Sequence, residues 1–483
     1  MALTKARNRM IEGASVNVKD FGAVGNGVTD DSSALQLALN QQGNIYFPDG
    51  TYIVKSTLTV KSNTSLFGSR NAVINGSTPT SVTNNTIFNI SGKEDVTVKG
   101  LSFIYDTDVA TAASMLTFDG SDRIRIYDNT FTSEDGDLAG NTSAVRVRET
   151  SAKGSNDVVI SGNYFEGPRL LILTQGGSGK IVKDVIISNN TFSQNTTAAP
   201  NPNILDGVVK IDLGTDNVVF SGNTCDGNNK TEGFFQVEET INNVTVTGNV
   251  INNCLGYGIF VYGGQTSSPV NNVTILGNVL SNAGIYVADL GSGSAGEIII
   301  SNNVVDGTQN LVQGTTVSGI DCQFGTVANI VISDNIVKNP TGYGIINRYG
   351  NAVISNNNIV GPVTYGIFNR HGANNNINNN NIHLSESTSS YGIGLRQCSG
   401  CLVTGNKIYG AGSSVNTGII FIDVERTSVQ NNYVNLATAT YGVYIDSASN
   451  KINLSNNTLS GNTASTNLAT NSVSTNNVNM DTI

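Results

Sequence analysis

The sequence predicts an all-β solenoid, in which short parallel strands wind about one axis and successive coils stack on each other. Three observations favour this fold: a phrase that recurs along most of the chain, strand-like runs of only three to five residues, and a surplus of Asn. Helical periodicity is absent through the repeats. Short strands at a fixed period, with no helices between them, describe a solenoid in which each repeat contacts only its neighbours.

The recurring phrase reads apolar-x-apolar, Ser or Thr, Gly or Asn, Asn, x, apolar. It is clear in Asp157–Phe165, Asp184–Phe192 and Asn217–Cys225, and weaker in Asp95–Phe103 and Asp122–Phe131. From the first clear copy onward its Asn recurs in eleven steps over 294 residues, a step of about 27 residues. A second phrase, Tyr-Gly followed by apolar residues, lies on a different strand of the coil, at Tyr257, Tyr343, Tyr365, Tyr391 and Tyr441.

The abundance of Asn has a structural explanation in this fold. The 483 residues include 67 Asn and 53 Gly. Stacking places equivalent residues of successive coils roughly 4.8 Å apart, where an Asn can adopt a left-handed backbone and hydrogen-bond the Asn above and below. We therefore expect Asn163, Asn190, Asn223 and their successors to form a structural ladder. Cys398 and Cys401 form a single C-x-x-C, half of what a zinc site needs, and we expect them to pack in the core.

Composition excludes several classes of protein. The net charge is −10, and only 13% of residues are charged, so a cationic surface for nucleic acid is not expected. No apolar run approaches the 18 residues of a membrane span, and no membrane insertion is expected. Five Cys form no readable disulfide framework, which favours folding in a reducing cytoplasm.

In chain order we predict four parts. Residues 1–17 are too few for a domain and are interpreted as a connector. Residues 18–50 form an N-terminal cap with an amphipathic helix at about 31–41, which covers the open edge of the first coil. Residues 51–461 form the solenoid. Residues 462–483 lose the phrase and are rich in Asn, Ser and Thr; they are either a trimerisation segment or a frayed tail.

The N-terminal part also carries a family resemblance. Val18-Lys-Asp-Phe-Gly-Ala-Val-Gly-Asn-Gly-Val-Thr-Asp-Asp-Ser-Ser-Ala-Leu-Gln, followed by Gly43-Asn-Ile-Tyr-Phe-Pro-Asp-Gly-Thr-Tyr, resembles the signature of pectate-lyase-superfamily right-handed parallel β-helices. With Asn8-Arg-Met-Ile-Glu-Gly before it, the segment is similar to the start of a bacteriophage tailspike. The motif Asp-Pro-His-Glu of alginate epimerases is absent, as are the paired Asn-Thr-Asp and Asp-Asp of polygalacturonases.

This resemblance implies a homotrimeric virion protein of the phage tail. Such proteins bind, and often cleave, a surface polysaccharide of the bacterial host: O-antigen, capsule or exopolysaccharide. The resemblance further implies assembly in the host cytoplasm, release by lysis, and attachment of residues 1–17 to a baseplate, tail or adaptor protein. We expect no cofactor and no metal.

Outward carboxylates are the candidates for hydrolysis. Alternation along the strands turns Asp212 and Glu238 outward, each five residues after a strand Gly on adjacent coils, and Asp289 takes the same place two coils later. Pairs roughly 5 Å or 10 Å apart would suit retaining or inverting glycosidases. Tyr262 and Tyr286, on the coils between, could stack on sugars. A solvated acidic face is the alternative, and a slip of one residue would turn any of these side chains inward.

A row of three arginines is the second constellation. Arg348, Arg370 and Arg396 each lie four residues after the strand Gly on consecutive coils, where like charges repel unless something compensates them. One interpretation is a salt-bridge ladder with acidic neighbours on the coils before and after: Asp321, Asp423, Glu425 and Asp446. The other is a groove for uronate, sulfate or pyruvate groups, lined by Tyr349 and His371 and extended by Asp321.

Three functions remain open after this reasoning. The first is a tailspike that depolymerises a bacterial polysaccharide, as an endo-glycosidase or as a lyase. The second is a tailspike of the same build that only binds its receptor. The third is a bacterial polysaccharide lyase or epimerase without a virion role. Four of five predicted loop insertions fall between residues 195 and 318, which favours the middle of the solenoid for a hydrolytic centre.

Overall fold

The structure is a computed structural model. It describes residues 14–69, 71–76, 86–105, 114–133, 143–148, 154–167, 169–173, 182–194, 207–212, 215–231, 233–263, 270–289, 296–310, 316–324, 329–349, 351–385, 390–410, 417–436, 440–460, 464–467 and 472–479. The chain divides into two units, Met1–Thr231 and Glu232–Ile483, and each is described by itself. Most of the predicted connector and most of the predicted insertions lie outside the described residues.

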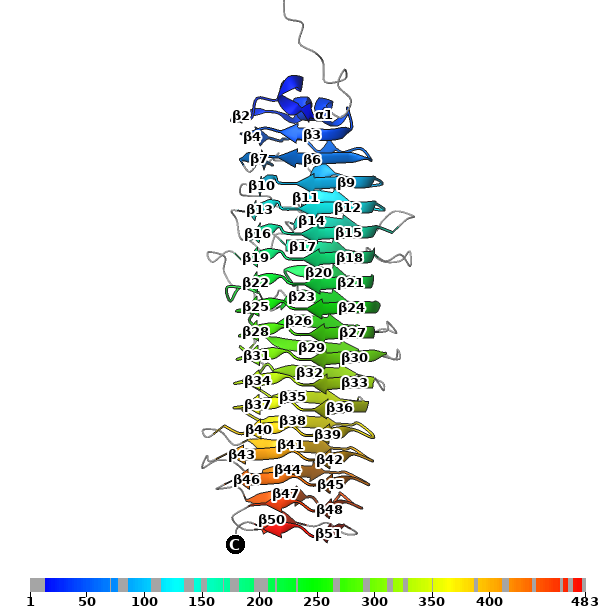
Figure 1. The fold of residues 1–483 in the computed structure, drawn as a ribbon, viewed down its shortest axis with the longest axis vertical. Coiled ribbons are helices and arrows are strands. Elements are labelled where there is room, and N and C mark those ends of the chain that lie inside the picture. The colour runs from blue at the N-terminus through cyan, green and yellow to red at the C-terminus, as the bar shows by residue number, and fades with distance from the viewer. Residues whose placement is uncertain are drawn as a thin grey trace, which may run out of the picture. The chain divides into compact units, whose positions relative to one another are not determined.

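Both units are built from the predicted coil. The strands form three sheets, numbered 1 to 3 and given strand by strand below. From β5 (Leu58–Thr59) onward each coil contributes its first strand to sheet 3, its second to sheet 1 and its third to sheet 2. Pairings between strands of one sheet within a unit are parallel, as between β9 (Glu94–Lys99) and β12 (Asp122–Tyr127). Within each unit the labelled strands of one sheet stack above one another (Figure 1). The all-β parallel solenoid that the sequence predicts is thus confirmed.

In the first unit, sheet 1 consists of β1 (Val16–Asn17), β3 (Gly43–Phe47), β6 (Thr64–Gly68), β9, β12, β15 (Asn156–Ser161), β18 (Val182–Ser188) and β21 (Thr215–Ser221). Sheet 2 consists of β2 (Asn26–Asp30), β4 (Gly50–Ile53), β7 (Ala72–Asn75), β10 (Ser102–Tyr105), β13 (Thr130–Ser133), β16 (Tyr164–Glu166), β19 (Thr191–Ser193) and β22 (Thr224–Asp226). Sheet 3 consists of β5 (Leu58–Thr59), β8 (Thr86–Asn89), β11 (Ser114–Phe118), β14 (Ser143–Arg148), β17 (Arg169–Leu173) and β20 (Val209–Asp212).

In the second unit, sheet 3 consists of β23 (Gly233–Glu238), β26 (Tyr257–Tyr262), β29 (Gly284–Asp289), β32 (Ile320–Phe324), β35 (Ile345–Arg348), β38 (Tyr365–Arg370), β41 (Tyr391–Arg396), β44 (Thr417–Ile422), β47 (Tyr441–Ile445) and β50 (Ala464–Asn467). Sheet 1 consists of β24 (Ile241–Thr247), β27 (Val270–Leu276), β30 (Glu297–Ser301), β33 (Asn329–Ser333), β36 (Asn351–Ser355), β39 (Asn376–Asn378), β42 (Leu402–Thr404), β45 (Ser428–Gln430), β48 (Asn453–Ser455) and β51 (Val473–Thr475). Sheet 2 consists of β25 (Val250–Asn252), β28 (Val279–Ser281), β31 (Val304–Asp306), β34 (Ile336–Lys338), β37 (Asn358–Val360), β40 (Asn381–His383), β43 (Lys407–Gly410), β46 (Tyr433–Leu436), β49 (Thr458–Leu459) and β52 (Val478–Asn479).

Two helices lie near the start of the described chain, the 3₁₀ helix η2 (Val18–Phe21) and the α-helix α1 (Ser32–Leu39). The buried face of α1 includes Leu35, Ala38 and Leu39. A helix was predicted at about 31–41; its role as a cap stays a prediction. Val16–Asn17, assigned to the connector from the sequence, already pair with β3.

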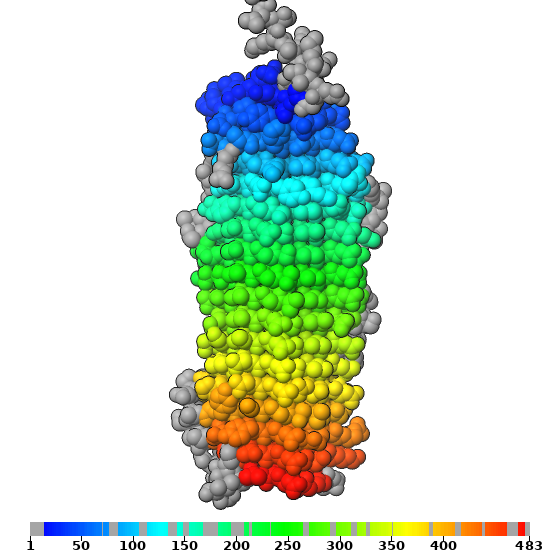
Figure 2. All heavy atoms as spheres, in the orientation of Figure 1, coloured from blue at the N-terminus to red at the C-terminus, as the bar shows by residue number. Residues whose placement is uncertain are grey.

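Inward side chains fill the interior of each unit. In the first unit Phe103, Phe131, Phe165 and Phe192 stack from coil to coil, with successive ring centroids 5.1, 5.0 and 4.6 Å apart. On the face shown in Figure 2 the atoms of successive coils within each unit are in contact. Identical slots on successive coils therefore repeat the same apolar packing, which is what a solenoid needs in order to bury a continuous core.

The Asn ladder is present and buried in both units. In the first unit the amides of Asn129, Asn163 and Asn190 each donate to the Asn of the next coil. In the second unit the ladder runs from Asn249 to Asn477, with Nδ2–Oδ1 distances of 2.9–3.0 Å. One detail of the prediction was wrong: the left-handed residue is the one before the ladder Asn, such as Gly162 or Asn189, which frees the Asn side chain to point inward.

The solenoid also continues beyond its predicted end at residue 461. Strands β50, β51 and β52 pair in parallel with β47, β48 and β49, and the Asn457 amide donates to Asn477. The predicted tail therefore contains another set of coil strands, because Asn477 and the apolar Val473 and Val478 repeat the phrase in a weaker form. Trimerisation through this segment stays a prediction. Among the described residues no helix is both long and apolar enough to cross a membrane.

Candidate functional site

The outer face of sheet 3 in the second unit gathers most of the predicted site residues. Strand alternation and register arrange its side chains in two outward columns, one residue per coil. The first, the aromatic column, contains Gln236, Phe260, Tyr286, Asp321, Ile346, Phe368 and Gly394. The second, the arginine column, contains Glu238, Tyr262, Ala288, Gln323, Arg348, Arg370 and Arg396.

The prediction that Asp289 shares the column of Glu238 was wrong. Glu238 aligns with Tyr262 and then with Ala288, and Asp289 aligns instead with Phe324. The register shifts between Tyr257 and Ile259, because β26 carries one residue more than β29 at this point. Counting from the strand Gly therefore displaces Asp289 by one residue. Its side chain is only 1% exposed and follows the alternation of the inward-facing strand residues.

Glu238 lies on the outer face as predicted. The neighbouring Phe235 and Val237 are fully buried, and Glu238 is half-buried and accepts a hydrogen bond of 2.5 Å from Gln236 Nε2. Asp212, its predicted partner, ends β20 in the first unit. Because the two units are described separately, a catalytic pair of Asp212 with Glu238 stays a prediction.

The three arginines share one column, as predicted from their spacing. Arg348 pairs in register with Arg370, and Arg370 with Arg396, so their backbones lie one strand spacing apart, roughly 4.8 Å. The Nε atoms of Arg348 and Arg370 are buried and have no hydrogen-bond partner among the described residues. Arg348 Nη1 donates to Gln323 Oε1 over 3.1 Å, and Arg396 is exposed.

No acidic neighbour among the described residues neutralises this row by a direct ion pair. Asp446 accepts hydrogen bonds from the backbone of Asp423 and from Ser449. Glu425 lies 3.5 Å from Arg426. These contacts of Asp446 and Glu425 give no support to the salt-bridge ladder. The arginine column therefore presents net positive charge on the outer face.

Asp321 lies beside the arginine column and is 4% exposed. Its Oδ2 accepts hydrogen bonds from Tyr257 Oη at 3.3 Å and from Gln323 Nε2 at 3.2 Å, whereas Oδ1 has no partner among the described residues. Burial raises the pKa of Asp321 to about 6, and the positive charge of Arg348 and the two hydrogen bonds only partly oppose that rise. Gln323 thus bridges a buried carboxyl group and an arginine.

Aromatic rings cover the same face. At its first coils the ring of Phe260 stacks on Tyr286 with centroids 4.8 Å apart, and Tyr257 contacts Tyr286 at 5.1 Å. The predicted Tyr262 lies 5.9 Å from Phe260. Each of these rings is partly exposed. They form a first aromatic group beside Asp321.

A second aromatic group lies further along the sheet, beside the arginines. Tyr365 stacks on Tyr343 and on Tyr391, with centroids 5.8 and 4.7 Å away. The Tyr365 ring and Phe368 lie so close to Gly394 that a Cβ there would collide with both. Gly394 therefore gives the Tyr365 ring its place, since no other residue leaves room for it.

The residues after the arginines line one side of the row. Tyr349, His371 and Gln397 each have a positive φ, of 65°, 58° and 53°. This conformation turns the chain directly after each arginine, and it lets Tyr349 and His371 stack with ring centroids 4.5 Å apart. Burial, with the charges of Arg370 and Arg396, lowers the pKa of His371.

The sequence missed three members of this arrangement. Tyr257 and Tyr365 begin the Tyr-Gly phrase, which the fold alone explains, so the phrase gives no separate signal that these rings belong to a site. Gln323 carried no signal, since a lone Gln is ordinary. Among the described residues no group of three metal-ligating side chains is assembled.

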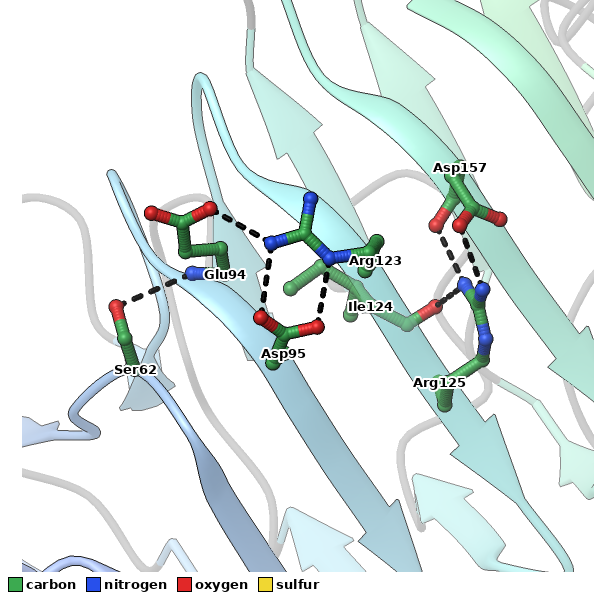
Figure 3. A network of polar contacts seen from close by, with 7 residues as sticks. All are labelled: Ser62, Glu94, Asp95, Arg123, Ile124, Arg125 and Asp157. Atoms are coloured by element: carbon green, nitrogen blue, oxygen red, sulfur yellow. Dashed lines mark hydrogen bonds and ion pairs between the residues drawn. The ribbon is translucent and has the colours of Figure 1, made fainter.

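A charged cluster in the first unit shows a different arrangement (Figure 3). Arg123 donates to both carboxylate oxygens of Asp95, at 2.6 and 2.8 Å, and to Glu94 at 2.7 Å. Arg125 reaches the carboxylate of Asp157 at 2.6 Å. The hydrogen bond from Arg123 lowers the pKa of Asp95. Each of these two arginines has an acidic partner within the chain.

Family models match most of the chain. A model described as the right handed beta helix region matches residues 114–305 and 318–483. A second, described as rhamnogalacturonase A/epimerase, pectate lyase-like, matches residues 15–201. The predicted likeness to pectate-lyase-like β-helices is thus confirmed.

Individual relatives match over short stretches. Plasmin and fibronectin-binding protein A of Streptococcus pneumoniae is 42% identical over 72 residues, which are 14% of this chain and 10% of that protein. The preneck appendage protein of Bacillus phage PZA is 46% identical over 61 residues, 12% of this chain and 7% of that protein. These alignments span no more than a tenth of either relative.

A solved structure of a phage protein is similar over nearly the whole chain. The pre-mature gene product 12 of bacteriophage phi29 superposes with a TM-score of 0.50 at 14% identity and covers 96% of this chain and 72% of that one. At this identity the likeness concerns the fold alone. It agrees with the predicted similarity to phage β-helices.

Proposed function

The chain belongs to the right-handed β-helix family, and from that premise we propose that it binds a polysaccharide along the outer face of sheet 3 in its second unit. The observation that carries this proposal is the pairing of partly exposed aromatic rings with an arginine column that has no direct acidic partner among the described residues. A polymer of similar units suits this site, because the site itself repeats from coil to coil.

Each part of the surface has a role in this proposal. The rings of Tyr262, Tyr286 and Tyr365 offer apolar faces on which sugar rings can stack while their hydroxyl tips stay polar. Arg348 and Arg370 offer guanidinium donors that suit planar anions such as uronates. Tyr349, His371 and Arg396 complete the surface at its edges, and Asp321 is buried beside the arginine column.

We propose that the chain is a tail protein of a phage virion and that its ligand is a polysaccharide of the bacterial surface. The pectate-lyase-like match at residues 15–201 and the similar phage appendage protein support this role. The homotrimer, and the attachment of residues 1–17 to another tail component, are part of the proposal. Light scattering of the purified chain tests the homotrimer: a mass near 50.6 kDa would contradict it.

Cleavage of the bound polysaccharide is a second candidate, favoured by the outward position of Glu238 beside Tyr262. Glu238 and Asp321, two predicted site carboxylates of the second unit, are three coils, about 14 Å, apart along the axis, beyond the roughly 9.5 Å that inverting glycosidases use. The predicted partner of Glu238 in hydrolysis remains Asp212. If new reducing ends appear with wild-type protein and vanish with Glu238→Gln, the pair is supported; unchanged product would eliminate it.

Binding itself is tested with an array of purified bacterial surface polysaccharides. We expect one or more to bind the wild type and to lose affinity in Tyr365→Ala. Tyr433→Ala is the matched control, since Tyr433 is 40% exposed but lies on sheet 2. Equal losses in both variants, or no binding across the array, would contradict the proposed surface.

A further inference from the structure

The carboxyl group of Asp321 lies where its charge would act on an anion bound at the arginine column. It lies in the aromatic column directly beside the arginine column, and it is almost fully buried. One oxygen accepts two hydrogen bonds and the other has no partner among the described residues. A fully satisfied structural carboxylate would have partners on both oxygens, because burying an ionised oxygen without one is costly.

Gln323 couples this carboxyl group to Arg348. Its Nε2 donates to Asp321 Oδ2 at 3.2 Å, and its Oε1 accepts from Arg348 Nη1 at 3.1 Å. The remaining donors of Arg348 include the buried Nε, which has no partner among the described residues. The protonation state of Asp321 therefore acts on Arg348, both through the charge itself and through the orientation of the Gln323 amide.

The groups that face Asp321 come from three neighbouring strands. Tyr257 on β26 donates its hydroxyl to the carboxyl group, Tyr286 lies on β29, and Arg348 lies on β35. Gln323 and Cys322 flank it on β32 itself. Burial raises the pKa values of Tyr257, Tyr286 and Cys322 far above neutrality, so these groups stay neutral.

Resting on the proposed function, we propose that Asp321 sets the charge of an anion subsite at Arg348 and Arg370, which takes a carboxylate-bearing sugar together with one proton. The protonated carboxyl group leaves the full charge of Arg348 for the ligand. The ionised group competes with the ligand for that charge and repels its carboxylate. Asp321 is thus a positioning residue that acts through Arg348 and Gln323, not a group that touches the sugar.

The proposal fixes the sign of a pH dependence. Because the pKa of Asp321 is about 6, the group is mostly protonated below that pH and ionised above it. A uronate carboxylate stays ionised down to roughly pH 4, so the ligand keeps its charge over the range of interest. Affinity for an anionic polysaccharide should therefore fall as the pH rises through about 6, and binding should take up protons at and just above that pH, where the carboxyl group is ionised in the free protein and protonated in the complex.

Sodium polygalacturonate is the probe, with neutral dextran and dextran sulfate as comparison arms. For the wild type we expect polygalacturonate to bind more tightly at about pH 5 than at about pH 8 by at least roughly fivefold, the lower end of ordinary coupling between two sites. In Asp321→Asn the affinity at pH 8 should equal that of the wild type at pH 5, and the pH dependence should vanish. Calorimetry in two buffers of different ionisation enthalpy should show proton uptake only with the wild type.

Two further variants separate Asp321 from other causes. His371→Gln should keep the pH dependence, because the proposal assigns that dependence to Asp321; burial and the charges of Arg370 and Arg396 lower the pKa of His371. Asp334→Asn removes an exposed carboxylate in the turn directly after β33 of sheet 1 and should change nothing. The same pH dependence in Asp321→Asn as in the wild type, or its loss in His371→Gln, would overturn the proposal.

The ligand arms distinguish this inference from the proposed function. Polygalacturonate binding that does not respond to pH would overturn the role of Asp321 and leave the polysaccharide surface standing. If array polysaccharides bind but polygalacturonate does not, or if only dextran sulfate or dextran binds, the carboxylate subsite is wrong. If no polysaccharide binds at any pH, the proposed function itself fails.

Discussion

Two charged surfaces of this chain, both formed by side chains of neighbouring coils, have opposite outcomes. In the first unit Arg123 and Arg125 hold acidic partners at 2.6–2.8 Å from neighbouring coils (Figure 3). In the second unit Arg348 and Arg370 stack with like charge and have no direct acidic partner among the described residues. A column that neutralises itself can be explained by stability alone, whereas a column of like charge costs stability and calls for an external partner.

The largest effect should follow from removing charge in the second unit. We expect Arg348→Ala combined with Arg370→Ala to weaken binding of an anionic polysaccharide by at least roughly a hundredfold, because hydrogen bonds to charged groups each contribute about 1.5–3 kcal/mol. The thermal midpoint should stay the same or rise, since the substitutions relieve repulsion. Calorimetric titration and a melting curve measure the two quantities.

The matched control is Arg123→Ala combined with Arg125→Ala in the first unit. Binding should be unchanged in that double variant. An equal loss of binding in both double variants would contradict the proposed difference between the two surfaces.

Asp321 provides the next largest effect, on stability. Its folded pKa of about 6 lies above the ordinary value of 3.8, so its contribution to stability is complete below about pH 4 and is lost as the pH rises through 6. Asp321→Asn should therefore stabilise the unliganded protein at pH 7.5, by at most about 3 kcal/mol for a rise of two pKa units. Denaturant titration of the wild type and the variant at pH 4 and pH 7.5 measures this difference in stability. A variant less stable than the wild type at pH 7.5 would contradict the claim that burying the ionised carboxyl group is costly.

A smaller effect is expected from Gly394→Ala. The new methyl group must displace the Tyr365 ring, and we expect binding to weaken severalfold, about 1 kcal/mol, as one aromatic stacking surface moves. Gly410→Ala is the control, because a Cβ there meets Leu384 Cβ at 3.3 Å, away from the aromatic column. Fluorescence or calorimetric titration measures the affinities, and similar losses in both variants would argue that the coil as a whole, not the ring, was disturbed.

The smallest effect should come from the compensated surface. Arg123→Ala removes exposed ion pairs, which contribute little to stability and weaken with salt. We expect a small loss of stability at low salt that disappears in high salt. Denaturant titrations at low and high ionic strength test this, and a large loss that ignores salt would mean that the cluster of Figure 3 does more than neutralise charge.

Repetition explains what the sequence could predict. The Asn ladder and the arginine column follow from counting equal positions on successive coils, and both are where that counting places them. The same counting failed for Asp289, because β26 has one residue more than β29 and a single extra residue turns a side chain to the other face. It also ended the solenoid too early, since the last coil keeps its ladder Asn477 but few of its apolar residues.

The contacts between columns could not be predicted in this way. The sequence placed Asp321 near the arginines, but not the burial of its carboxyl group, nor the bridge through Gln323. Nor does a periodic pattern encode the hydrogen bond by which Tyr257 reaches Asp321 across two coils. The proposed role of Asp321 therefore depends on contacts that depart from the repeat.

The most direct test of the polysaccharide surface is a crystal structure of the protein with an oligosaccharide cut from a polysaccharide that it binds. Our account predicts sugar rings along the outer face of sheet 3, against Tyr286 and Tyr365, with a carboxylate at Arg348 and Arg370. Sugar bound on sheet 1 or sheet 2, or on sheet 3 with the arginine column free of contact, would contradict it.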